Sequence, residues 1–80
     1  MGNSKHPELD KTQLAQKIGQ RIKAMRSRIN INQAELARRC GKDSQHIELI
    51  ENGKVSATIY TLYIVARALD STLDELLKLD

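Results

Sequence analysis

The stretch QAELARRCGKDSQHIELIEN, residues 33–52, decides the fold, because it places small or apolar residues where two short helices crossing over a tight turn need them. One face of a first helix carries Leu36, Ala37 and Cys40, and a second helix has an apolar edge formed by Ile47 and Ile50. Nearly every other position in the stretch is polar. The pattern therefore predicts two helices that pack against a common core.

The residues between these two segments predict a sharp turn. Gly41 can adopt the left-handed backbone conformation that ends a helix without a Cβ penalty. Asp43 then offers a carboxylate to the free N–H groups at the start of the next helix. We predict that this helix spans residues 44–52 and ends at Gly53.

Apolar residues at helical spacing predict three more helices. The expected buried positions are Leu14, Ile18, Ile22, Met25 and Ile29 for residues 12–28, then Ile59, Leu62, Val65, Ala66 and Leu69, and finally Leu73, Leu76 and Leu77. Two capping boxes are expected, one formed by Asn32 with Glu35 and one by Thr72 with Glu75. Asn30, in the linker after the first helix, is suited to the left-handed region.

Several blocks of the chain match one family in order and spacing. They are NQAELA at 32–37, Gly41, IELIENGK at 47–54, TLYIVARAL at 61–69 and LDELL at 73–77. The chain thereby resembles, from about residue 18 to residue 77, the Cro/C1-type or xenobiotic-response-element family that includes lambdoid phage repressors. The resemblance implies an all-α, compact five-helix bundle with a helix-turn-helix, the lambda-repressor-like DNA-binding fold. It also implies a protein that binds operator DNA, usually as a homodimer.

Length and composition allow a single domain. We predict an N-terminal arm over residues 1–10, which are rich in Gly, Asn, Ser and Pro, followed by the helix-turn-helix domain over residues 11–80. Because the chain has neither a transmembrane run nor the apolar segment of a signal peptide, we expect it to be cytoplasmic, without contact to a membrane. The single cysteine, Cys40, is expected to pack in the core.

Charge is distributed unevenly along the chain. The net charge is +8 over residues 11–42 and −4 over residues 43–80, although the whole chain carries only +3. Such a distribution favours the approach of a polyanion to the basic half. Taken without the motif, it is equally consistent with basic residues that only keep an amphipathic helix soluble.

The second helix of the motif provides the candidate base-reading residues. If Ile47 and Ile50 face inward, then Ser44, Gln45 and Leu49 face outward and can reach base edges in the major groove. The amide of Gln45 can pair with adenine N6 and N7. Leu49 departs from the polar residue usual in the family, and it either contacts a thymine methyl group or merely covers the edge of the helix.

Other polar residues are candidates for phosphate contacts, which supply affinity without choosing a sequence. They are Arg28, Asn32, Gln33, Lys42, His46, Asn52 and Lys54. Lys42 stands where the family usually has a small or apolar residue. His46 either contacts a phosphate or is simply an exposed polar side chain. By resemblance to phage repressors, Arg26 and Glu51 are expected to form a structural ion pair between helices.

Classes of function other than DNA binding have less support in the sequence. No catalytic constellation, cofactor motif or metal-ligand cluster occurs in the sequence, so we do not expect an enzyme. An antitoxin-type or protein-interaction module with a toxin or other protein partner, and a controller protein of a restriction-modification system, remain alternatives. The predicted homodimer interface contains Tyr60, Ile64 and Leu79, unless the N-terminal arm covers the first two through Leu9.

Overall fold

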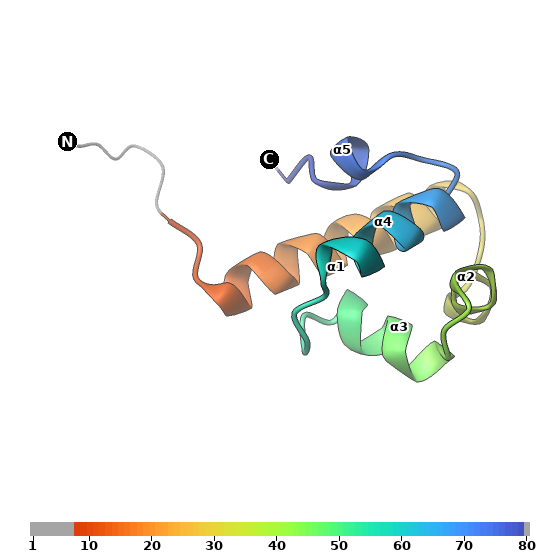
Figure 1. Cartoon of the computed structure of the whole chain (residues 1–80), viewed down its shortest axis with the longest axis horizontal. Helices are drawn as coiled ribbons and strands as arrows, with labels where there is room; N and C mark the ends of the chain where they lie inside the picture. The colour runs from red at the N-terminus through yellow and green to blue at the C-terminus, as the bar shows by residue number, and fades with distance from the viewer. Residues whose placement is uncertain (1–7, 80) are drawn as a thin grey trace.

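Five helices follow one another along the chain in the computed structural model, which describes residues 8–79 (Figure 1). They are α1 (Lys11–Arg28), α2 (Gln33–Cys40), α3 (Ser44–Glu51), α4 (Ile59–Ala68) and α5 (Leu73–Leu76). The part of the chain that is described contains no strand, so the predicted all-α class is confirmed. No helix among these five is long and apolar enough to cross a membrane. The predicted arm lies mostly outside the described residues.

α1 begins one residue earlier than predicted, because Asp10 caps it. The Asp10 carboxylate accepts a hydrogen bond from the backbone N–H of Gln13 at 2.8 Å, and the Gln13 side chain accepts one from the backbone N–H of Asp10 at 3.0 Å. This reciprocal pair satisfies two N–H groups that a helix start otherwise leaves free. Sequence reasoning missed this box and predicted two others.

The two predicted capping boxes form only in part. Asn32 accepts from the N–H of Glu35 at 2.8 Å, and Thr72 accepts from the N–H of Glu75 at 3.3 Å. Neither glutamate returns a bond to its cap residue, because the Glu35 carboxylate binds two arginines one turn later and the Glu75 carboxylate binds Lys78 at 2.7 Å. A cation forms a stronger hydrogen bond with a carboxylate than a backbone N–H does.

The core lies between the second half of α1 and the four helices that follow it. Its members are Ile22, Met25, Leu36, Ala37, Ile47, Ile50, Leu62, Val65, Ala66, Leu69 and Leu76, all nearly inaccessible to solvent. Cys40 packs against this cluster, and burial raises the pKa of its thiol. The helical period therefore identified the central residues of each buried face correctly.

Four predicted core residues are exposed instead. The exposed fractions are 42% for Leu14, 37% for Ile29, 65% for Ile59 and 38% for Leu77. Ile29 and Leu77 are the C-cap residues of α1 and α5, and Ile59 is the first residue of α4. Leu14 lies in the first half of α1, which extends beyond the other helices (Figure 1). Among the described residues, no neighbouring element fully covers these four side chains.

At Gly19 the backbone of α1 lies directly against the end of α3. It is buried, and a Cβ added to it would lie 2.5 Å from the carbonyl oxygen of Ile50. Any side chain at this position would push the helices apart. The helical spacing of apolar residues did not predict that Gly19 is buried, because glycine has no apolar side chain to contribute to that pattern.

Candidate nucleic-acid interface

The turn between α2 and α3 consists of residues 41–43 and has the predicted geometry. Gly41 has φ 68°, in the left-handed region, and the N–H of Lys42 donates to the carbonyl oxygen of Ala37 at 2.9 Å. The Asp43 side chain then accepts from the N–H of His46 at 2.8 Å and caps α3. The predictions for Gly41 and Asp43 are confirmed.

α3 has one buried face and one exposed face. Ile47 and Ile50 are buried, whereas the predicted base-reading residues Ser44, Gln45 and Leu49 are exposed, Leu49 by 36%. The exposed face can therefore present a hydroxyl, an amide and an apolar group to a surface beside it. Glu48 is exposed as well, and its carboxylate can accept a hydrogen bond from cytosine N4. Sequence reasoning did not consider Glu48.

α3 is held against α1 by a buried ion pair. The Arg26 guanidinium donates from Nε to Glu51 Oε2 at 2.7 Å and from Nη2 to Glu51 Oε1 at 3.0 Å, and its Nη1 donates to the carbonyl oxygen of Ile31 at 3.0 Å. The Glu51 side chain has no exposed surface. The hydrogen bond that Arg26 donates to Glu51 raises the pKa of Arg26. Arg26 and Glu51 thus form the ion pair between helices that the family resemblance implied.

Gln33 extends this pair into a network of three helices. Its Nε2 donates to Glu51 Oε1 at 2.9 Å, which links the first turn of α2 to the last turn of α3. Gln33 was predicted from the sequence to contact a phosphate, and its hydrogen bond to Glu51 was not predicted. The bond orients the Gln33 side chain through one of its two amide N–H groups, and the other N–H stays available to an acceptor.

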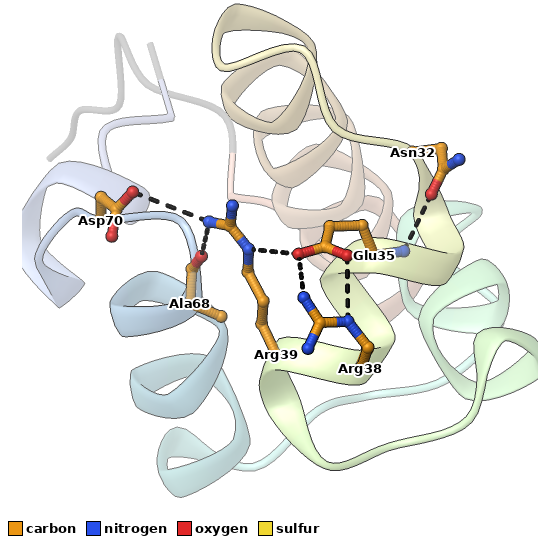
Figure 2. A network of polar contacts seen from close by, with 6 residues as sticks. All are labelled: Asn32, Glu35, Arg38, Arg39, Ala68 and Asp70. Carbon is orange, nitrogen blue, oxygen red and sulfur yellow. Dashed lines mark hydrogen bonds and ion pairs between the residues drawn. The ribbon is translucent and has the colours of Figure 1, made fainter.

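A second network joins α2 to the end of α4 (Figure 2). Glu35 accepts from Arg38 at 2.5 Å and from Arg39 at 3.0 Å, and Arg39 also donates to the carbonyl oxygen of Ala68 at 3.0 Å. The hydrogen bonds from Arg38 and then Arg39 lower the pKa of Glu35. Arg39 lies 3.7 Å from a carboxylate oxygen of Asp70 as well. Arg38 and Arg39 are thus held in intramolecular pairs, as Arg26 is.

The candidate phosphate contacts are distributed over the ends of three helices. Asn32 caps α2, Lys42 lies in the turn before α3, Asn52 caps the C-terminal end of α3 and Lys54 follows it. Gln33 and His46 occupy the first turns of α2 and α3, and Arg28 the last turn of α1. Within residues 8–79, none of the three cations Arg28, Lys42 and Lys54 belongs to an ion pair, and neither does His46. They can therefore meet an anion without losing an existing partner.

Comparisons with known proteins identify relatives of this chain. Residues 22–76 match the family model described as helix-turn-helix. The chain is 32% identical over 60 residues to an uncharacterized HTH-type transcriptional regulator of Archaeoglobus fulgidus, a match that covers 75% of this chain and 84% of the relative.

Solved structures with the same fold include two regulators. The restriction-modification controller protein C.AhdI from Aeromonas hydrophila has a TM-score of 0.75 and 29% identity, covering 78% of this chain and 94% of that one. The P22 c2 repressor, solved in complex with a synthetic operator, has a TM-score of 0.70 and 32% identity, covering 79% of this chain and 96% of that one. The arrangement of α2, α3 and their neighbours is thus shared with these proteins.

Proposed function

Because this chain belongs to the helix-turn-helix family of DNA-binding transcriptional regulators, we propose that it is a repressor that acts as a homodimer on a palindromic operator. The observation that supports the proposal most is the geometry of α3. This helix is capped by Asp43, is held by the buried Glu51 and presents Ser44, Gln45 and Leu49 outward. A helix held in this way can enter the major groove with its first residues toward the bases.

The proposed base contacts differ in selectivity. Gln45 forms a bidentate pair with adenine, which contributes roughly 1 to 3 kcal/mol of discrimination against a wrong base. Ser44 is less selective, because its hydroxyl both donates and accepts. Leu49 adds an apolar contact to a thymine methyl group. Asn32, Gln33, Lys42, His46, Asn52, Lys54 and Arg28 contact phosphates in this proposal and set the position of α3 along the groove.

The proposed dimer interface is the exposed face of α4. Tyr60 is 69% exposed and stacks on Tyr63 with the ring centroids 6.5 Å apart, while Ile64 on the same helix is partly buried. Leu79, predicted to add exposed apolar surface, is itself partly buried and lines a groove of about 240 Å³ together with Ile59. Pairing of two copies over this face would cover apolar groups that otherwise contact water.

A second candidate, a controller protein of a restriction-modification system, is favoured by the similarity to C.AhdI. Both candidates require binding to an operator, and they differ in the gene that is regulated. The antitoxin alternative requires a toxin as protein partner, and copurification of a protein encoded by a neighbouring gene would support it.

Selection of bound sequences from random duplexes tests the proposal. We expect an enriched inverted repeat whose half-sites lie about 34 to 36 Å apart, one turn of DNA. We also expect affinity for that site to fall roughly 10³- to 10⁵-fold between 50 and 200 mM salt, provided that 6 to 10 phosphates are neutralised. Recovery of unrelated sequences, or affinity that does not change with salt, would contradict the proposal.

A further inference from the structure

The first half of α1 lies outside the segment that matches the family. α1 starts at Lys11, whereas the family match starts at Ile22. The helix carries three lysines, of which Lys11 and Lys17 precede the matched segment and Lys23 lies at its start, and it has no acidic residue. None of the three lysines forms an ion pair within the part of the chain that is described.

The loop that follows α3 packs against the first half of α1 at Gly53. Gly53 has φ 69°, and an added Cβ would lie 2.8 Å from the Cα and 3.0 Å from the backbone nitrogen of Gln16. The two backbones are therefore in contact, with no side chain between them. The side chains on this side of α1 consequently lie beside Asn52 and Lys54, two of the candidate phosphate contacts.

Two of the three lysines line hollows shared with the α3 region. A hollow of about 300 Å³ is lined by Lys11, Thr12, Ala15, Gly53, Lys54, Val55 and Ser56. A hollow of about 310 Å³ is lined by Gln16, Gln20, Lys23, Glu51 and Asn52. Lys17 instead lines a hollow with Arg21 and Lys78, beside the C-terminal segment. Lys11 and Lys23 thus lie beside the end of α3 and the loop after it, whereas Lys17 lies beside the C-terminal segment.

The polar groups that line the hollows of Lys11 and Lys23 suit the oxygens of a phosphate. Ammonium, hydroxyl and amide groups all donate hydrogen bonds to such oxygens. The only acidic group in either lining, the Glu51 carboxylate, already accepts hydrogen bonds from Arg26 and Gln33. Residues 52–58 contain a single basic residue, Lys54, so Lys11 provides a second cation where the loop has only one.

We propose that α1 is an additional DNA-backbone contact of this protein, in which Lys11 and Lys23, but not Lys17, bind phosphates. This inference rests on the proposed function, because it extends the contact surface of α3 and its loop along α1. It assigns the contacts to the DNA backbone and not to the bases. Loss of either lysine therefore weakens all sequences alike and leaves base preference unchanged.

The test is the salt dependence of DNA affinity for wild type and for the variants Lys11→Gln, Lys23→Gln and Lys17→Gln. All three variants remove one positive charge from an exposed position of the same helix, and thermal unfolding confirms that each is folded. The slope of log K against log[salt] is negative. We expect Lys11→Gln and Lys23→Gln each to reduce its magnitude by roughly 0.9 per protomer, and Lys17→Gln to retain the wild-type slope.

Several results would overturn the inference: unchanged slopes for Lys11→Gln and Lys23→Gln, a change for only one of them, or an equal change for Lys17→Gln. An equal change in all three would mean that only net charge matters. Failure of the proposed function gives a different result, because wild type itself would then show no salt-dependent, sequence-selective binding.

Discussion

The α2–α3 region and the α4 region expose different chemistry. Around α3, the buried carboxylate of Glu51 joins three helices, and the exposed face is polar except for Leu49. α4 packs on the core mainly through apolar residues, with a polar link from Arg39 to the Ala68 carbonyl oxygen at its end, yet its exposed positions include Ile59, Tyr60 and Tyr63. A polar face beside basic residues suits a nucleic acid, whereas an apolar face suits another protein surface. Substitutions in the α2–α3 region are therefore expected to affect stability and DNA binding, whereas substitutions on the exposed face of α4 are expected to affect association.

The largest expected effect is on the stability of the α2–α3 region. Arg26→Met leaves the Glu51 carboxylate buried with only Gln33 as partner, and breaking a buried pair in this way costs about 3 to 5 kcal/mol. Glu51→Leu should also destabilise the fold. In the double variant, coupling of roughly 0.5 to 3 kcal/mol should restore part of the loss. Urea denaturation of all four proteins measures the coupling.

Arg38→Gln is the control for this cycle. Arg38 also pairs with a glutamate, but its side chain is 73% exposed and the pair is screened by solvent, so its loss should destabilise the fold far less than Arg26→Met does. Additive losses in the cycle, or equal losses for Arg26→Met and Arg38→Gln, would show that burial of the Arg26 pair does not matter.

The next effect concerns association through α4. Ile64→Glu and Tyr60→Glu each place a charge on the proposed interface, and both should shift sedimentation from dimer to monomer at tens of micromolar protein. Tyr60→Glu is the cleaner test, because Tyr60 is 69% exposed and contributes little to the core. Ala24→Glu, at an exposed position of α1, adds the same charge elsewhere and should leave the dimer intact. A monomeric wild type, or a dimer that persists in both α4 variants, would reject this interface.

A smaller effect is expected for the surface network of α2. Because Arg38 and Arg39 lower the pKa of Glu35, this carboxylate stabilises the folded state at neutral pH. That contribution is lost as the pH falls through the lowered pKa, below the usual range of a glutamate. Glu35→Gln should therefore make the melting temperature depend less on pH in the acid range. Glu48→Gln, which removes an exposed carboxylate without an ion pair in the described residues, should retain the wild-type dependence, and identical curves for the two variants would contradict this assignment.

Much of the fold could be predicted from local features of the sequence, namely the spacing of apolar residues and the residues that cap and end helices. The apolar period identified the buried residues in the middle of each helix, and Gly41 and Asp43 predicted the turn before α3. Errors fall at helix ends, as at Ile59 and Leu77, because burial there depends on which neighbour extends far enough to cover them.

Contacts between distant segments were harder to predict. Gly19 and Gly53 permit backbone contacts that only the assembled fold shows. The hydrogen bond from Gln33 to Glu51 links residues 18 positions apart, and nothing near Gln33 in the sequence indicates it. The pairing of Arg26 with Glu51 was predicted only through resemblance to a family. The exposed face of α3, by contrast, followed from the inward placement of Ile47 and Ile50.

The most direct test of the central claim is the base preference of a Gln45→Ala variant, measured by selection from random duplexes beside wild type and Lys54→Ala. If α3 reads the operator, Gln45→Ala should relax preference at one position in each half-site, at a cost of roughly 1 to 3 kcal/mol for the preferred base. Lys54→Ala should weaken binding to all sequences about equally. If Gln45→Ala selects the same site as wild type with undiminished preference at every position, Gln45 does not read a base and the assignment of α3 as the recognition helix is contradicted.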